Sequence, residues 1–226
     1  LNNSWRDYSY SSALHEAVVY SYNAGVSFVA AAGNETNNND NSPMYPASYN
    51  VPNVISVAAT TDSDNLASFS NYGRNTVGLA SPGYRIYSTY PGNSWGLSSG
   101  TSMASPFVAG LAAGIMKNQP NILGYQLKEV ILTNTDPVTA LATKVQTQGR
   151  MNVYDALSAA GSVSISSSQP DYSFVPTREM ASAAAGGCGT VSTLMKGGGS
   201  GGLGAPGTES WSVFLVLALM LLPVIV

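Results

Sequence analysis

Residues 100–110 read Gly100-Thr101-Ser102-Met103-Ala104-Ser105-Pro106-Phe107-Val108-Ala109-Gly110, and the rest of the chain is best interpreted outward from them. Met103, Phe107 and Leu111 recur every four residues, which is the spacing of one face of an α-helix. Pro106 lacks the N–H that a helix interior uses, so the pattern predicts that it lies in the first turn. Ser102 is therefore predicted at or just before a helix N-terminus.

Two roles are open to Ser102 at this position. Serine is a common helix cap, and spacing alone favours that role. The other role is a nucleophile, because the free N–H groups and the positive dipole end of a helix N-terminus favour negative charge. Such charge develops on oxygen when a serine attacks a carbonyl group. One residue is able to serve as both cap and nucleophile.

The eleven residues resemble the serine-nucleophile motif of the subtilisin-like proteases, or subtilases. Phe107 stands where the family usually has His, and this variation touches no catalytic role. The resemblance implies a three-layer α/β fold with a mainly parallel sheet, of which the N-terminal part is expected to be missing from this sequence. It also implies a serine endopeptidase that forms an acyl-enzyme on Ser102. The resemblance covers about residues 3–160, roughly the second half of a catalytic domain.

A second motif follows a predicted strand. Residues 26–32 form an almost continuous apolar run, which is typical of a parallel strand covered on both faces. The run ends at Gly33 and Asn34, and functional groups gather at the carboxyl ends of such strands. Asn34 alone would favour a simple turn residue. The run Ala31-Ala32-Gly33-Asn34, however, resembles the subtilase oxyanion-hole segment, so Asn34 is the second implied catalytic residue, through its neutral side-chain donor.

The resemblance also implies a set of substrate-binding residues. Residues 3–5 are similar to the segment that forms one edge of the substrate cleft, and Arg6 replaces the usual glycine, so its side chain is expected to crowd or charge the cleft. Residues 44–49 resemble the lining of the pocket for the residue before the scissile bond, with Met44 near the floor. The Tyr45–Pro46 bond in this segment is a candidate for cis geometry. The implied substrate-binding residues are Ser4, Trp5, Arg6, Ala32, Gly33, Met44 and Thr101.

The chain contains one histidine, His15, on a helix predicted from Ser11 to Ala24. In subtilases the catalytic base comes from another element, which lies N-terminal to everything present here. His15 is therefore rejected as the base and is expected at the surface or half-buried. The catalytic His and Asp are expected in the missing N-terminal segment, and residues 1–226 alone are predicted to be inactive.

The remaining regular elements follow from local patterns. Apolar runs predict strands, amphipathic spacing predicts helices, and clusters of small and turn-forming residues predict loops. We predict strands over 53–60 and 84–90, helices over 125–133 and 154–160, loops over 67–73 and 80–83, and a turn-rich approach over 91–99.

Composition limits the partners. Charged residues make up 9% of the chain and the net charge is −3, so nucleic-acid binding has no electrostatic basis. A single cysteine, Cys188, excludes an internal disulfide framework, and no cluster of metal-ligand residues occurs. The resemblance implies no required cofactor. Calcium is an open expectation that the sequence does not show: some subtilases bind a weak cation near the carbonyls that match Ala47 and Tyr49.

The C-terminal part differs from the rest. Residues 1–160 are predicted to be the C-terminal part of a subtilase catalytic domain, 161–210 a Ser/Gly-rich linker, and 211–226 a hydrophobic tail. As a helix the tail would reach ~24 Å, short of the ~30 Å hydrocarbon core. The tail resembles a sorting or anchor signal, and Cys188 is either a lipidation site or an inert thiol. These features predict a secreted or cell-surface protein that acts on protein or peptide substrates and is attached to a membrane or cell envelope through 211–226. The alternative is a non-catalytic subtilase-like binding module anchored at the surface.

Overall fold

A sheet of six strands forms the centre of the computed structural model, which describes residues 1–164, 166 and 168–172. The strand order is β1-β2-β3-β4-β8-β7; β1 to β4 and β8 pair in parallel, and β7 pairs antiparallel with β8. The strands are β1 (Asn2–Asn3), β2 (Phe28–Ala31), β3 (Val54–Thr60), β4 (Leu79–Pro82), β7 (Thr135–Pro137) and β8 (Gly149–Met151).

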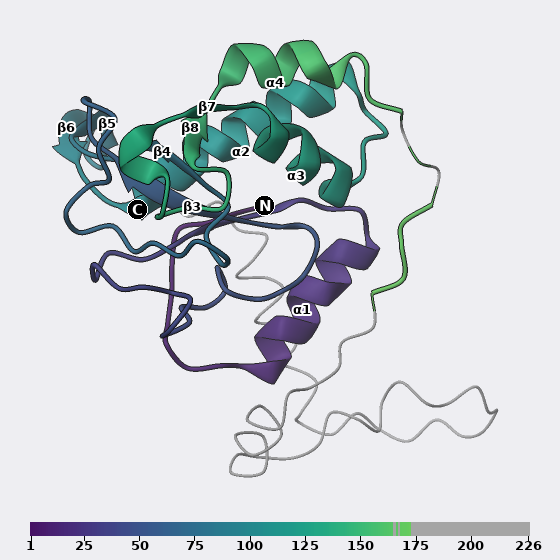
Figure 1. Cartoon of the computed structure of the whole chain (residues 1–226), viewed down its shortest axis with the longest axis horizontal. Helices are drawn as coiled ribbons and strands as arrows, with labels where there is room; N and C mark the ends of the chain where they lie inside the picture. The colour runs from purple at the N-terminus through teal and green to yellow at the C-terminus, as the bar shows by residue number, and fades with distance from the viewer. Residues whose placement is uncertain (165, 167, 173–226) are drawn as a thin grey trace. The chain divides into compact units, whose positions relative to one another are not determined.

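Helices cover both faces of this sheet. They are α1 (Ser12–Asn23), α2 (Thr101–Asn118), α3 (Gly124–Thr133) and α4 (Val153–Ala160), with a short 3-10 helix η1 (Thr139–Leu141). Figure 1 shows α1 on one side and α2, α3 and α4 on the other. Side chains of β2 point alternately to the two faces: Val29 packs in the core with α2, whereas Phe28 and Ala30 pack with Val18 and Tyr22 of α1. The predicted three-layer α/β architecture is therefore confirmed.

The strand predictions over 26–32 and 53–60 match β2 and β3, but the predicted loop over 80–83 is wrong. Residues Leu79–Pro82 form β4, which pairs with β3 through Val57↔Leu79 and Ala58↔Ala80. This four-residue strand is defined by its pairing with β3, which no local sequence pattern reveals. Its carboxyl end positions the nucleophile segment, because the N–H of Gly100 donates to the carbonyl of Gly83 at 2.8 Å.

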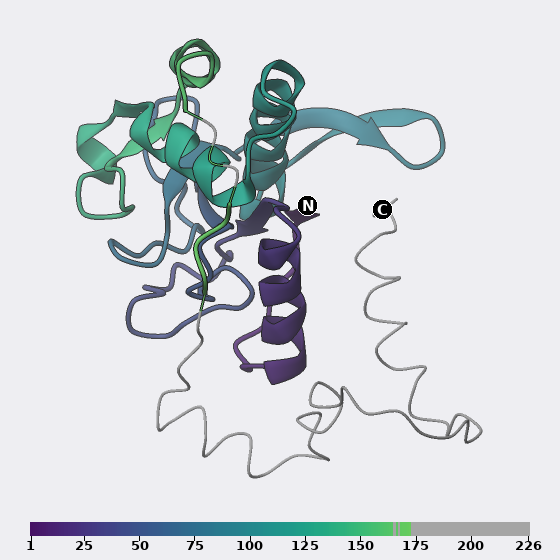
Figure 2. The ribbon, with the colours of Figure 1, turned by 90° about the vertical axis from the view of Figure 1, so that its right-hand side faces the viewer.

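A second sheet is the antiparallel hairpin of β5 (Ile86–Tyr90) and β6 (Ser94–Ser98). The predicted strand over 84–90 is confirmed as β5, whereas the turn-rich prediction over 91–99 is wrong for β6. Gly92 and Asn93 both have positive φ and close the turn, and the rings of Tyr87 and Trp95 stack across the strands at 5.9 Å. Figure 2 shows the hairpin extending away from the helices.

Helix α2 corrects the expectation for Pro106. The helix begins at Thr101, after the N-cap Gly100, so Ser102 lies within the first turn. Pro106 lies in the helix interior. A proline cannot donate to the carbonyl four residues earlier, which here is that of Ser102. The hydroxyl of Ser4 donates to this carbonyl at 3.0 Å instead. A long-range hydrogen bond thus replaces the helical one that Pro106 removes.

The first residues of the predicted linker contact the domain. Residues 161–164, 166 and 168–172 include no helix or strand. Tyr22 donates to the carbonyl of Pro170 at 2.7 Å, and Tyr172 donates to the carbonyl of Asn50 at 2.6 Å. Cys188 and the tail 211–226 lie outside the described residues, so the linker and anchor assignments stay predictions. In the part of the chain that the structure describes, no helix is both long and apolar enough to span a membrane.

Candidate active site

Ser102 and Ser4 form a reciprocal hydrogen-bonded pair at the N-terminus of α2. The Ser102 hydroxyl donates to the carbonyl of Ser4 at 3.0 Å, while the Ser4 hydroxyl donates to the carbonyl of Ser102. Ser105 lies 3.0 Å from the Ser4 hydroxyl and acts as the donor, because the single Ser4 proton is already used. The Ser102 hydroxyl thus keeps its proton and donates a hydrogen bond to a neutral carbonyl, which does not activate the serine.

Asn34 contacts Thr101, the residue before Ser102, and its amide is held in one orientation. Its Oδ1 accepts from the Thr101 N–H and from the Thr101 hydroxyl, both at 2.9 Å. Because the backbone N–H is always a donor, the oxygen end of the amide must face it. The Nδ2 end lies near Gly100, where an added Cβ would sit 3.3 Å from it. The arrangement leaves the Asn34 Nδ2, which is a neutral N–H donor, near Gly100, two residues before Ser102.

The turn that carries Asn34 is held by the buried Asn71. Asn71 N–H donates to the carbonyl of Gly33 at 2.9 Å, and its Oδ1 accepts from the N–H of Glu35 at 2.8 Å. Its Nδ2 donates to the carbonyl of Ala32 at 3.2 Å. Gly33 has φ +115°, and a Cβ there would collide with Asn71. Sequence reasoning missed Asn71, because it lies in a polar loop with no local pattern that points to this turn.

Arg6 and Glu35 form an ion pair beside the same turn. Arg6 Nε donates to Glu35 Oε1 at 2.9 Å, and Glu35 Oε2 accepts from the N–H of Asn34 at 2.8 Å. The hydrogen bond from Arg6 is the main cause that lowers the pKa of Glu35 below 4.5. Arg6 was expected to charge the cleft, but its positive charge is paired, so it does not act as a lone cation.

Arg6→Gln is expected to raise the pKa of Glu35 towards its ordinary value of 4.5, because the largest stabilising contact of the carboxylate is lost. A depressed carboxyl pKa contributes stability above its unfolded value, and that contribution is lost as the pH falls through the folded value. The stability loss in Arg6→Gln is thus expected at neutral pH, below ~1 kcal/mol for such a solvent-screened pair, and to vanish at lower pH. Carboxyl NMR titration and urea unfolding measure both effects. Arg85→Gln, at an exposed arginine, is the control, and an unchanged Glu35 pKa in Arg6→Gln would contradict the assignment.

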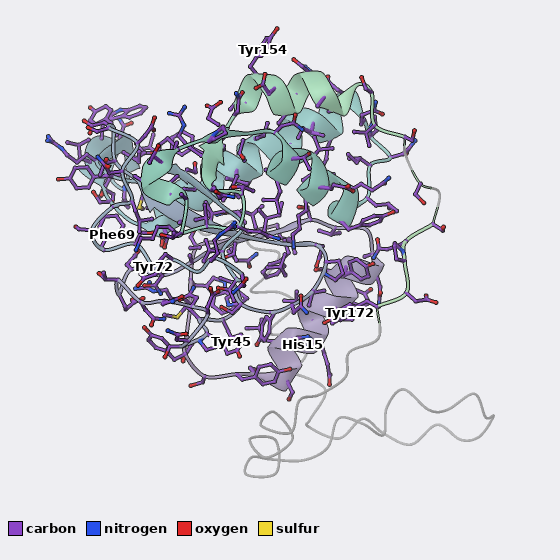
Figure 3. The ribbon with its side chains drawn as sticks, in the orientation of Figure 1. His15, Tyr45, Phe69, Tyr72, Tyr154 and Tyr172 are labelled. Atoms are coloured by element: carbon purple, nitrogen blue, oxygen red, sulfur yellow. The ribbon has the colours of Figure 1, made fainter. Side chains whose placement is uncertain are left out.

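His15 lies on the other face of the sheet from Ser102. Its side chain is 4% exposed, so the expectation of a surface or half-buried residue is wrong. Its ring packs 5.1 Å from that of Tyr49 and 6.0 Å from that of Tyr10, and burial lowers its pKa. Figure 3 shows His15 on α1, on the same side as Tyr45. Because the sheet separates α1 from α2, His15 is not positioned to take the Ser102 proton.

The other predicted site residues fall into exposed and buried groups. Trp5 is 40% exposed, whereas Met44 is 1% exposed and Thr101 and Ala32 are fully buried. The cleft-edge segment joins the predicted pocket segment through Asp7 and Tyr45, whose backbones pair at 2.9 and 2.8 Å. The cis geometry expected for Tyr45–Pro46 is confirmed. The substrate-binding roles of these residues stay predictions.

Comparisons with known proteins find similar sequences and a similar fold. Two curated relatives are subtilisin-like protease 2 of Plasmodium falciparum, 41% identical over 65% of this chain and 11% of its own length, and thermitase of Thermoactinomyces vulgaris, 42% identical over 65% of this chain and 50% of its own length. The chain therefore spans no more than about half of either relative. A solved protease structure from Pseudoalteromonas arctica has a TM-score of 0.63 at 28% identity and covers 70% of this chain and 50% of that chain.

The family assignment rests on a match over most of the domain. The family model described as Peptidase S8, subtilase family, matches residues 1–167, which include Ser102, Asn34 and the whole six-stranded sheet. The chain therefore belongs to the subtilase family.

Proposed function

We propose that this chain is the nucleophile-bearing part of a serine endopeptidase that hydrolyses peptide bonds through an acyl-enzyme on Ser102. The observation that carries the proposal is the orientation of the Asn34 amide. Its oxygen is fixed by two hydrogen bonds from Thr101, and its nitrogen lies near Gly100, two residues before Ser102. Donors that are oriented before the reaction stabilise an oxyanion at no cost in reorganisation.

The proposed reaction has two halves. Ser102 Oγ attacks the carbonyl carbon of the peptide, its proton passes to a base, and the carbonyl oxygen becomes an oxyanion. Asn34 Nδ2 and the N–H of Ser102, a first-turn donor without a helical partner, bind that oxyanion. The leaving amine takes the proton as the C–N bond breaks, and water then releases the acyl group by the same steps.

The base is proposed to come from outside residues 1–226. The chain has one histidine, and His15 packs against the opposite face of the sheet from Ser102. The carbonyl of Ser4, which accepts a hydrogen bond from the Ser102 hydroxyl, is a neutral amide oxygen and not a general base. Family membership supports a His oriented by an Asp as the missing pair, so we propose that this chain alone is inactive.

Proteins or peptides are the proposed substrates. Ser4, Trp5 and Arg6 would form one edge of the cleft, with Ala32, Gly33 and Thr101 beside the scissile bond. The buried Met44 would narrow the pocket that binds the substrate residue before the scissile bond, so the pocket would exclude the bulkiest side chains. A chain with 9% charged residues also supports a secreted or cell-surface location, with 211–226 as the proposed anchor. The second candidate, a non-catalytic binding module, is favoured by the one observation that Ser102 donates to a carbonyl rather than to a base.

Peptide hydrolysis by the full-length polypeptide, meaning the complete product of the gene that encodes residues 1–226, separates the two candidates. We expect new peptide termini from denatured casein by mass spectrometry, lost in Ser102→Ala and kept in the control Ser68→Ala, whose serine is exposed. Casein that is bound but left intact would support the binding module. Hydrolysis that persists in Ser102→Ala would overturn the proposed nucleophile.

A further inference from the structure

Two loops meet behind the turn that carries Asn34, and a buried side chain lies between them. One loop follows β2 and the other follows β3, and the N–H of Asn39 in the first donates to the carbonyl of Tyr72 in the second at 2.7 Å. In the reverse direction, the N–H of Tyr72 donates to the carbonyl of Asn37 at 3.0 Å. Figure 3 labels Tyr72 in the second loop. The side chain of Asn39 is fully buried at this junction.

The amide of Asn39 contacts three different parts of the junction. Its Nδ2 donates to the carbonyl of Ala32 at 2.9 Å, and Ala32 directly follows β2, two residues before Asn34. Its Oδ1 accepts from Nδ2 of Asn71 at 3.1 Å and from Nδ2 of Asn37 at 3.0 Å. An asparagine amide has two donor and two acceptor positions, and three of these four are used within the protein here.

The backbone fixes the orientation of the two buried amides. Asn71 Oδ1 accepts from the N–H of Glu35 at 2.8 Å and from the N–H of Asn37 at 3.0 Å. A backbone N–H is always a donor, so the oxygen of Asn71 must face the turn and its nitrogen must face Asn39 and Ala32. The group of Asn39 that meets this nitrogen must then be its oxygen. Each amide thus has one allowed orientation, and each stabilises that of the other.

Loss of the Asn39 amide would leave the nitrogen of Asn71 with one acceptor, the carbonyl of Ala32 at 3.2 Å. Both asparagines are fully buried, and a buried donor without an acceptor is costly. We therefore expect Asn71 to shift when Asn39 is replaced by an apolar residue. Because Asn71 binds the N–H of Glu35, the residue after Asn34, such a shift moves the turn that carries the Asn34 amide.

We propose that Asn39 is a positioning residue for the Asn34 donor, which it holds in place through Asn71. Its side chain acts at a distance from the reacting atoms and determines where Asn34 Nδ2 lies when the oxyanion forms. Donors fixed before the reaction stabilise an oxyanion best, and small displacements of such groups lower the rate. The inference rests on the proposed function, because it gives Asn39 a task in the same oxyanion hole.

Asn39→Leu in the full-length polypeptide should lower kcat several-fold and leave KM nearly unchanged, because a transition-state donor is displaced. The loss should be smaller than in Asn34→Leu, which removes the donor. In the Asn34→Leu background, Asn39→Leu should lower kcat little further, whereas a smaller folded fraction would lower it equally in both backgrounds. Asn41→Leu, at an exposed asparagine of the same loop, is the matched control and should leave both constants unchanged. Steady-state kinetics on one peptide substrate measures these effects.

Asn39→Ser is the second variant, in case leucine prevents folding. Its smaller side chain leaves room for a water molecule to bridge Asn71 and Ala32, so the turn should shift less. We expect a smaller loss of kcat than in Asn39→Leu, again without a change of KM and again abolished in the Asn34→Leu background.

Backbone hydrogen exchange tests the same link without catalysis. The N–H groups of Glu35 and Asn37 should exchange faster in Asn39→Leu and Asn39→Ser than in the unmodified protein and Asn41→Leu, relative to the N–H groups of β3, which report on global unfolding. If the unmodified polypeptide hydrolyses no peptide, the proposed function fails and exchange alone decides the role of Asn39. Unchanged exchange at Glu35 and Asn37, an unchanged kcat in an active protein, or equal fold-losses of kcat with and without Asn34 would overturn the inference.

Discussion

Asn34→Leu in the full-length polypeptide is expected to lower kcat by about 10²–10³-fold, the magnitude known for loss of an oxyanion-hole asparagine in subtilisin, and to leave KM nearly unchanged. Leucine has a similar volume but no donor. In the proposed mechanism, the hydrogen bond from Asn34 Nδ2 strengthens only when the carbonyl oxygen becomes an oxyanion, so its loss would fall on the transition state. Steady-state kinetics on one peptide substrate measures both constants.

Two further variants test how Asn34 acts. Thr101→Val removes one of the two hydrogen bonds that orient the Asn34 amide and leaves the bond from the Thr101 N–H, so a smaller loss of kcat is expected. Asn121→Leu, at an exposed asparagine between α2 and α3, should leave both constants unchanged. A large rise of KM in Asn34→Leu at constant kcat would instead assign Asn34 to binding of the ground-state substrate.

Continuous local patterns account for the parts of the fold that the sequence predicted. The apolar runs that became β2 and β3 are buried at every strand position, as expected for strands covered on both faces. Helix α1 begins after Ser11, whose hydroxyl accepts from the N–H of Leu14, and this cap is visible in the sequence. The motif around Ser102 correctly predicted that this serine lies at the N-terminus of a helix, which is α2.

Long-range partners account for the parts that the sequence did not predict. The interior position of Pro106 depends on Ser4, which lies about a hundred residues earlier and satisfies the carbonyl of Ser102. The orientation of Asn34 depends on Thr101, and its turn depends on Asn71. The burial of His15 depends on rings from Tyr10 and Tyr49. Apart from Tyr10, these partners lie far along the chain from the residues they hold, so no local pattern reveals them.

Residues 1–226 alone are expected to show no serine-dependent chemistry, which is the larger of the two effects. Removal of the serine or the histidine of the triad in subtilisin costs about 10⁶-fold in kcat. This chain keeps the serine, but the Ser102 hydroxyl donates its hydrogen bond to the carbonyl of Ser4, which is not a base. A serine hydroxyl without an adjacent base is a weak nucleophile at neutral pH.

The central claim is that Ser102 is a nucleophile whose base lies outside this chain, and covalent labelling with a fluorophosphonate probe tests it most directly. The probe would be added to residues 1–226 alone, to the full-length polypeptide and to the Ser102→Ala form of each, and the labelled residue identified by mass spectrometry. We predict rapid labelling at Ser102 in the full-length polypeptide and none in the other three samples. Equally rapid labelling of Ser102 in residues 1–226 alone would contradict the claim, because the base would then lie within this chain.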